Sequence, residues 1–271
     1  MKKTGILLNE ILDKSKELNN SDNLKLLYSC IDLTNLNSYA KKSDIDNLCT
    51  KARLIDHKGI AVPRVAAVCI YPLYIELCKK LLNETGIQIA TVTADFPHAQ
   101  TFSEVKYLET ELALKHGADE IDIVLNLSAF LNGETSVAFD EIKTIKQICG
   151  EKHLKVILET GILQEKSLIH EASVLAIEAG ADFIKTSTGK DGSVASTEAA
   201  FIMCKAISEN YKNTGKRVGL KPAGGISTSG QALDYLAIIY ALLGDDWLTP
   251  ELFRIGASRL AGNLLDALKP K

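Results

Sequence analysis

From residue 26 onward, short apolar runs alternate with longer segments in which apolar residues recur every three or four positions. The short runs are typical of buried strands, and the longer segments are typical of amphipathic helices. The expected strands are 26–34, 65–71, 88–94, 120–126, 153–160, 182–188, 217–222 and 253–257. The helices expected after them are 40–55, 73–84, 102–116, 138–149, 165–179, 197–211, 229–242 and 257–268.

Eight successive strand–helix units predict an α/β fold in which a parallel sheet closes into a (β/α)₈ TIM barrel. An open doubly wound sheet is the alternative. It is disfavoured because no G-x-G-x-x-G motif follows the first strand and because the candidate polar residues are spread over many strands. Barrels of about 250 residues form one domain, so residues 1–271 are expected to be a single domain. In this fold, chemistry takes place at the carboxyl ends of the strands.

The segment 1–24 is expected to form a short N-terminal helical extension. Its basic start and the apolar run Ile6-Leu7-Leu8 are like the beginning of a signal peptide, but the apolar run already ends at Asn9. The loosely spaced apolar residues around it indicate a helix that packs against the end of the barrel. No part of the sequence is apolar over the length that spans a bilayer.

Composition narrows the class of ligand. The chain is 46% apolar and 24% charged, with a net charge of -3, and it has no basic stripe for nucleic acid. A small-molecule ligand is therefore expected, with no nucleic acid and no membrane as partner. The six cysteines are scattered without a C-x-x-C pair, which indicates reduced thiols and a cytoplasmic protein. The five histidines lack metal-ligand spacing, so neither a metal nor another cofactor is expected.

Lys185 lies in the strand-like run 182–188. Strand alternation places it on the same face as Phe183 and Ser187, which makes it an interior residue. A buried lysine avoids the cost of desolvation either by losing its proton or by pairing with a buried carboxylate. The neutral amine would be a nucleophile, whereas the ion pair would only hold the barrel together.

A second lysine, Lys221, follows in the next strand-like run, 217–222, where alternation separates it from its apolar neighbours. Two ammonium groups on adjacent strands repel each other, which favours loss of the proton from one of them. A neutral amine in a closed cavity can attack a carbonyl group and form a Schiff base. The two lysines together therefore predict the making or breaking of a carbon–carbon bond.

Asp122 lies in the run 120–126, whose apolar residues share the opposite face, so its carboxylate is expected to point into the barrel. It could relay a proton during the reaction, or it could form a structural ion pair with Lys221 or Lys155. Asp32 is also expected to face inward, where it would bind a substrate hydroxyl or hold Lys221 in place. Cys69 is expected to form part of the pocket wall and not to act as a nucleophile.

Glycine-rich turns follow the last two strands and predict a phosphate site. Gly224 and Gly225 precede a segment that can cap a helix, and Gly256 and Ser258 form a similar turn after the eighth strand. Barrels often bind phosphate in the loops after strands seven and eight. The alternative is that these glycines merely permit tight turns. Two further residues of the expected substrate site lie in the loop after the Lys185 strand, namely Thr188 and Lys190.

Five motifs, in this order along the chain, resemble those of the deoxyribose-phosphate aldolase family: IDLTNL at 31–36, AAVCIYP at 66–72, DEIDIV at 119–124, FIKTSTGK at 183–190 and GLKPAGG at 219–225. The resemblance extends from about Leu26 to about Leu268. It implies a barrel enzyme that reversibly cleaves 2-deoxy-D-ribose 5-phosphate to D-glyceraldehyde 3-phosphate and acetaldehyde. It further implies that Lys185 forms the Schiff base, and that Asp122 and Lys221 transfer the proton.

The chain also departs from the family pattern. Ser227 stands where the pattern has an arginine, and Arg259 stands where it has a serine. The segment 90–101 is one residue longer than expected, and the C-terminus lacks the tyrosine found in some members. Two alternatives stay open, namely a Schiff-base barrel aldolase for another sugar phosphate and a non-catalytic sugar-phosphate-binding barrel. The sequence does not decide the oligomeric state, for which a homodimer is one option.

Overall fold

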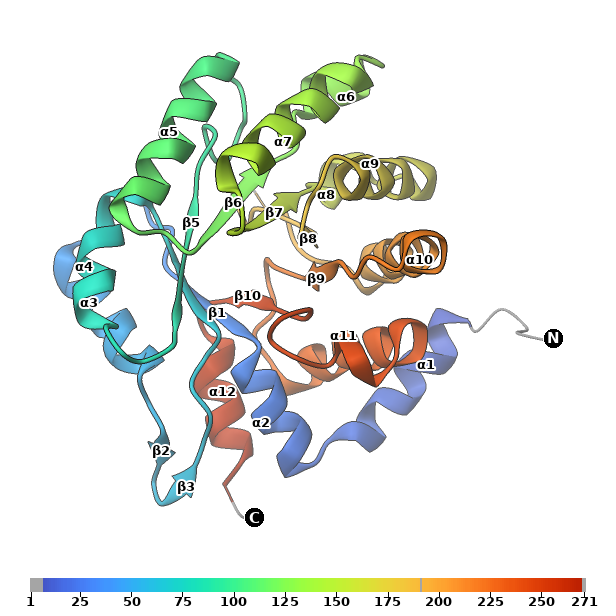
Figure 1. Cartoon of the computed structure of the whole chain (residues 1–271). Helices are drawn as coiled ribbons and strands as arrows, with labels where there is room; N and C mark the ends of the chain where they lie inside the picture. Colours follow the sequence, from blue (N-terminus) through green and yellow to red (C-terminus); the bar gives the residue numbers. More distant parts are fainter. Residues whose placement is uncertain (1–6, 191, 270–271) are drawn as a thin grey trace.

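The computed structural model describes residues 7–190 and 192–269, and its centre is an eight-stranded parallel sheet (Figure 1). The strand order is β10-β1-β4-β5-β6-β7-β8-β9, and the bridges Leu220–Phe253 and Ala223–Gly256 join the two edges into a nearly closed barrel. The predicted α/β fold of TIM-barrel type is therefore confirmed. The strands of the barrel are β1 (Ile31–Thr34), β4 (Ala67–Ile70), β5 (Gln88–Val92), β6 (Glu120–Val124), β7 (His153–Ile157), β8 (Phe183–Lys185), β9 (Gly219–Lys221) and β10 (Ile255–Ala257).

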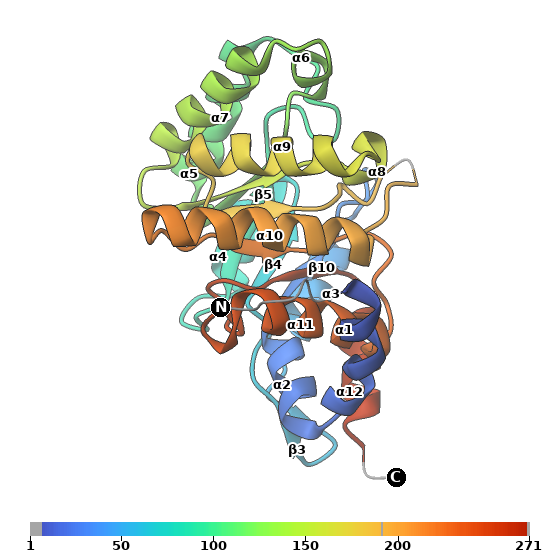
Figure 2. The same ribbon diagram turned by 90° about the vertical axis from the view of Figure 1, so that its right-hand side faces the viewer.

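Helices surround this sheet, and each barrel strand is followed by one (Figures 1 and 2). The long ones lie where the periodicity predicts them, with ends that differ by a few residues. The helices are α3 (Lys42–Ala52), α4 (Ile75–Leu81), α5 (Ser103–His116), α7 (Thr135–Cys149), α9 (Lys166–Glu178), α10 (Thr197–Thr214), α11 (Ser229–Leu243) and α12 (Leu260–Ala267). Shorter elements that the periodicity did not predict are α6 (Leu127–Leu131), α8 (Thr160–Leu163) and the hairpin β2 (Asp56–His57) with β3 (Ile60–Ala61).

The first expected strand, 26–34, is wrong over its first half. Helix α2 (Ser21–Ser29) extends through this part, and β1 begins only at Ile31. The Asn20 side chain accepts a hydrogen bond from the backbone of Asn23 and caps the helix, while Leu24, Leu27 and Tyr28 are buried at helical spacing. Helix and strand follow each other almost without a loop, so their apolar residues form one continuous run in the sequence.

The N-terminal extension is helical, as predicted, over its described part. It consists of α1 (Leu8–Ser15), a 3₁₀ turn (Lys16–Leu18) and α2, and residues 1–6 lie outside the described part of the chain. Helix α1 packs against α11, where the Ser15 hydroxyl donates a 2.6 Å hydrogen bond to Asp234. Figure 2 shows α1 beside α11 at the edge of the barrel. Within the described residues, no helix combines the length and the apolar character needed to cross a membrane.

Strand alternation separates the two faces of the barrel wall. Ile121 and Ile123 of β6 point outward into the core between sheet and helices, whereas Asp122 makes its contacts inside the barrel. The parallel register sets Lys185 beside Lys221 and sets Asp122 beside Lys155. The interior of the barrel is therefore polar and charged at this level, while its outer layer is apolar.

Candidate active site

Lys185 and Lys221 converge on one carboxylate oxygen inside the barrel. The Nζ of Lys185 lies 2.8 Å from Asp122 Oδ2, and the Nζ of Lys221 lies 2.7 Å from the same atom. Lys185 ends β8 and Lys221 ends β9, and their Cα atoms are partners in the parallel register. All three side chains are buried. The structure thus brings together the three residues that the sequence singled out for chemistry.

Asp122 is bound on its other side by Lys155, which lies next to it on β7. Lys155 Nζ is 3.0 Å from Asp122 Oδ1 and 2.6 Å from Glu120 Oε2. The sequence interpretation considered Lys155 only as a structural partner, and it missed Glu120. Strand alternation carries the signal for both, because Glu120 is two residues from Asp122, and Lys155 alternates with the apolar residues of its own strand.

Asp32 of β1 forms an ion pair with Lys221 and is fully buried. Its other oxygen accepts a 2.7 Å hydrogen bond from Arg254, directly before β10. These contacts favour the positioning role for Asp32 over direct contact with a substrate hydroxyl. Burial alone would lower the pKa of Lys221, but Asp122 and Asp32 outweigh it and raise the pKa above its usual value.

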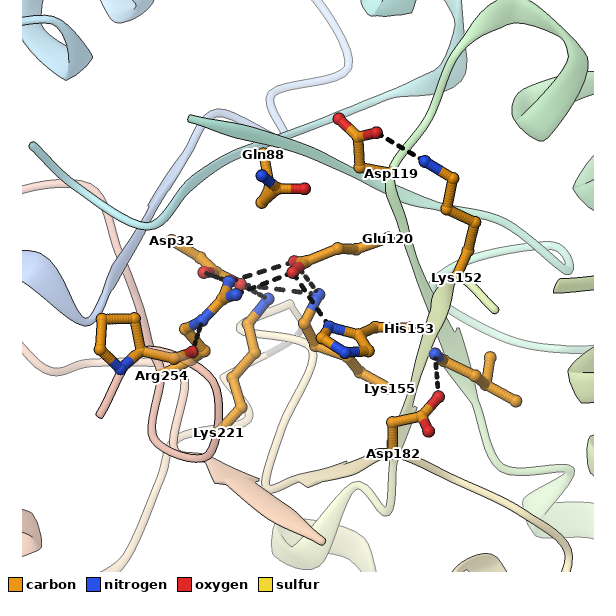
Figure 3. A network of polar contacts seen from close by, with 12 residues as sticks. Asp32, Gln88, Asp119, Glu120, Lys152, His153, Lys155, Asp182, Lys221 and Arg254 are labelled. Atoms are coloured by element: carbon orange, nitrogen blue, oxygen red, sulfur yellow. Dashed lines mark hydrogen bonds and ion pairs between the residues drawn. The ribbon is translucent and has the colours of Figure 1, made fainter. Parts of the chain in front are cut away.

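Arg254 completes the network by joining Asp32 to Glu120 (Figure 3). Its guanidinium group lies between Asp32 and Glu120, with Nη2 at 2.8 Å from Glu120 Oε1. The sequence interpretation missed Arg254, which stands just before a short strand and has no neighbouring charge at strand spacing. Burial works to raise the pKa of Asp122 and of Glu120, but the surrounding cations lower both pKa values well below their ordinary range.

The buried cluster has more positive than negative groups. Three carboxylates face four basic side chains, so the fully ionised cluster carries one excess positive charge. Lys155 and Lys221 each lie within ion-pair distance of at least two carboxylates, whereas Lys185 reaches Asp122 alone among the described residues. The members are Asp32, Glu120, Asp122, Lys155, Lys185, Lys221 and Arg254. Within residues 7–190 and 192–269, no group of His, Cys, Asp or Glu side chains is arranged to hold a metal ion.

A cavity of about 590 Å³ opens above Lys185 at the carboxyl ends of the strands. Lys185 itself is part of its wall, and so are the glycine turns after β9 and β10. Asp32 and Cys69 are the two candidates for substrate contact that lie outside this wall. The candidates that line it are Thr188, Lys190, Gly224, Gly225, Gly256 and Ser258, together with Arg259.

Cys69 lies inside the barrel, where it packs with Leu36, Ala90 and Val92. It is almost completely buried, and burial raises the pKa of its thiol. A buried thiol with a raised pKa is a poor nucleophile. Cys69 therefore packs behind the residues that line the cavity and is not itself part of the wall in which the sequence placed it.

The turn after β9 has the backbone shape of an anion site. Gly224 and Gly225 have φ values of +93° and +77°, and a Cβ added at Gly224 would lie 2.8 Å from the Ser193 carbonyl oxygen. In the part of the chain that the structure describes, neither glycine donates its backbone N–H to another group. Helix α11 begins just beyond the turn, with Thr228 as its cap, so the positive end of the helix lies next to the turn.

Basic side chains surround the same part of the cavity. Arg259 is exposed at the start of α12, and Lys190 donates a hydrogen bond to the carbonyl oxygen of Leu36, which also lines the cavity. Backbone N–H groups, a helix N-terminus and nearby cations form the usual environment of a bound phosphate. This arrangement could hold a phosphorylated substrate whose other end reaches Lys185.

Comparison with known proteins agrees with this geometry. The family model described as "DeoC/LacD family aldolase" matches residues 27–236. The chain is similar over 97% of its length to 98% of deoxyribose phosphate aldolase from Aeropyrum pernix, with 25% identity and a TM-score of 0.74. A protein from Coccidioides immitis, provisionally assigned as a deoxyribose-phosphate aldolase, has 25% identity and a TM-score of 0.75 over 97% of this chain and 98% of that chain. A similarly assigned protein from Toxoplasma gondii ME49 has the same fold, with 23% identity and a TM-score of 0.79 over 92% and 94% of the two chains.

Proposed function

We propose a specific reaction for this chain, which belongs to the DeoC/LacD family of aldolases. The reaction is the reversible cleavage of 2-deoxy-D-ribose 5-phosphate to D-glyceraldehyde 3-phosphate and acetaldehyde, through a Schiff base on Lys185. The observation that carries the proposal is the position of Lys185, which ends β8 in the cavity wall with its amine 2.8 Å from Asp122. The substrate itself is proposed from the similarity to deoxyribose-phosphate aldolases.

Lys185 supplies the amine because it has the fewest ion-pair partners of the three lysines in the cluster. Loss of its proton removes the excess positive charge of the cluster, which a buried site favours. The neutral amine then attacks C1 of the open-chain aldehyde, and the resulting carbinolamine loses water to give a protonated imine. Lys221 remains an ammonium group between Asp122 and Asp32, so it favours the neutral form of its neighbour.

Cleavage then breaks the bond between C2 and C3. A base removes the proton from the C3 hydroxyl, and the C2–C3 electron pair moves toward the imine. D-glyceraldehyde 3-phosphate is released, and an enamine remains attached to Lys185. Protonation of C2 and hydrolysis of the imine release acetaldehyde and return the water lost earlier. Asp122, bound to Lys155, Lys185 and Lys221, is the proposed proton-transfer group, acting with Lys221 through a water molecule.

The turns after β9 and β10 are proposed to hold the phosphate. Gly224 and Gly225 offer backbone N–H groups, and Arg259 adds a full positive charge from the facing turn. Lys190 would exchange its bond to the Leu36 carbonyl for a bond to phosphate. These groups and Lys185 line the same cavity. The cavity therefore suits a substrate with an aldehyde at one end and a phosphate at the other.

Borohydride trapping tests the nucleophile. The protein is incubated with acetaldehyde and sodium cyanoborohydride, and peptide mass mapping is expected to find one reduced adduct at Lys185. Lys185→Arg should abolish labelling, whereas Lys205→Arg, which changes an exposed lysine of α10, should not. An adduct at another lysine, or none at all, would contradict the proposal. A substrate panel with 2-deoxyribose 5-phosphate and ribose 5-phosphate then tests the preference for a substrate without the 2-hydroxyl group.

A further inference from the structure

The buried cluster reaches the opposite end of the barrel from the proposed substrate cavity. A second cavity, of about 540 Å³, lies at the amino ends of the strands, and Glu120, His153 and Arg254 form part of its wall. Figure 3 shows Glu120 linked to Arg254, Lys155 and His153. Arg254 is therefore not a group that can touch a substrate bound above Lys185.

Arg254 connects the two carboxylates that hold the inner lysines. It lies 2.7 Å from Asp32, the partner of Lys221, and 2.8 Å from Glu120, the partner of Lys155. It also donates to the Pro250 carbonyl oxygen, and its guanidinium carbon lies 5.6 Å from the centre of the Phe183 ring. These contacts hold the Arg254 side chain in one position, and the residue is only 4% exposed.

Other titratable groups face this region from several elements. His153 of β7 lies 3.4 Å from Glu120, and Cys30, which is buried, precedes β1. Around the cavity at the amino ends of the strands lie Arg64, Asp119, Glu151, Lys152 and Glu251. The titratable groups near Lys185 inside the barrel are Asp122, Lys221 and Cys69. Those around the proposed substrate cavity are Asp44, Lys51, Lys190 and Arg259.

Arginine differs from the lysines of the cluster because it stays protonated at any pH at which the protein is folded. The positive charge of Arg254 is thus permanent, and it changes the charge balance that the lysines experience. With Arg254 present, the ionised cluster has an excess of one positive charge, and release of one lysine proton makes it neutral. Without Arg254, three lysines and three carboxylates would balance, and release of a proton would leave an excess negative charge.

We propose that Arg254 and Glu120 are positioning residues that act through the charge of the buried cluster and set the pH at which Lys185 becomes a nucleophile. The inference rests on the proposed function, because it assigns the Schiff base to Lys185. Arg254 favours the neutral amine, and Glu120 opposes it. The two residues therefore tune the same amine in opposite directions from the end of the barrel remote from the substrate.

The signs of the expected effects follow from the charges. Arg254→Met removes a positive charge and stabilises the ammonium form of Lys185, so the rate of labelling should reach its half-maximum at a higher pH. Glu120→Gln removes a negative charge and should move the midpoint to a lower pH. One buried charge is expected to move it by about one pH unit, which is about a tenfold change in rate on the acidic side. Arg254→Lys keeps the charge and should keep the wild-type midpoint.

The test measures the first-order rate of labelling at Lys185 by acetaldehyde and sodium cyanoborohydride between pH 5 and 9. Arg254→Met, Arg254→Lys, Glu120→Gln and the double variant R254M/E120Q are compared after thermal melting has shown that each is folded. The double variant loses one charge of each sign, so its midpoint should return toward the wild-type value. Arg217→Met is the matched control, because Arg217 forms an exposed ion pair with Asp246 at the surface.

The outcomes separate this inference from the proposed function. If wild-type protein gives no adduct at Lys185, the proposed function fails. If the adduct forms but all midpoints coincide, or if Arg254→Met and Glu120→Gln shift in the same direction, only the charge-setting role is overturned. Should Arg254→Met not fold, Glu120→Gln still decides the matter, because a midpoint at or above the wild-type value would overturn the inference.

Discussion

Arg259 lines the proposed substrate cavity, and Ser227 occupies the position where the family pattern has an arginine. Both residues flank the proposed phosphate position, Ser227 before α11 and Arg259 before α12. The position of Arg259 in the cavity wall supports the idea that it replaces the missing charge. A guanidinium group can bind a phosphate oxygen pair through two parallel hydrogen bonds, which makes it an effective substitute.

Arg259→Ala is expected to raise the KM for 2-deoxyribose 5-phosphate by about tenfold to a hundredfold, because a charge-assisted hydrogen bond contributes about 1.5–3 kcal/mol. The kcat should change little, since Arg259 is proposed to bind the phosphate and not the reacting carbonyl group. Steady-state retro-aldol assays check this, with Arg217→Ala as a control that removes an exposed arginine elsewhere. An unchanged KM for the phosphorylated substrate, or an equal rise for unphosphorylated 2-deoxyribose, would contradict the assignment.

The strands β8 and β9 show how an element of the barrel accommodates the charged cluster. Phe183 begins β8 and turns its ring into the barrel below the lysines, where the ring centre lies 6.0 Å from Lys155 Nζ. The neighbouring position on β9 is Gly219, its register partner. A Cβ at Gly219 would overlap the Phe183 ring, so the glycine is required for close packing and not for a special backbone angle.

Gly219→Ala is therefore expected to destabilise the protein by about 1–3 kcal/mol, since the ring has to leave a fully packed position. Gly262→Ala is the matched control, because a Cβ there meets nothing within 4 Å. Gly262 lies inside α12, where alanine is favoured over glycine by up to about 1 kcal/mol. Urea denaturation should give changes of opposite sign for the two variants, and equal changes would show that Phe183 can move freely.

The stability of the folded molecule depends on keeping Asp122, Glu120 and Lys221 ionised. The pKa values of Asp122 and Glu120 are lowered well below the ordinary range on folding, so their contribution to stability is complete above the unfolded-state pKa. It is lost as the pH falls through the folded-state values. The pKa of Lys221 is raised, so its contribution is complete below its unfolded-state value and is lost as the pH rises through the folded-state value.

The part of the free energy of unfolding that these three groups contribute is accordingly expected to be level between about pH 5 and pH 9 and to fall on both sides. Urea denaturation midpoints from pH 3 to pH 11 measure this profile. Glu120→Gln should lower the plateau and flatten the acidic side, because an amide has no proton to gain there. An acidic side as steep as that of the wild-type protein would show that Glu120 does not contribute to it.

Strand alternation in the sequence was sufficient to place Lys185, Lys221 and Asp122 inside the barrel. The side-chain period of a strand is local, so three residues could be assigned to one face before their strands were placed. The order of eight strand–helix units similarly predicted the barrel, because parallel strands joined by helices allow few other arrangements. The exception was the start of the first strand, where the capping of α2 by Asn20 outweighed the apolar pattern.

Only the tertiary structure decided which charges meet. Asp32 and Arg254 are 222 residues apart and become neighbours because β1 pairs with β10 when the barrel closes. The sharing of one Asp122 oxygen by two lysines depends in the same way on the register of four strands. Local sequence patterns determine which face a side chain takes, whereas its partners depend on barrel closure and register, which are properties of the whole sheet.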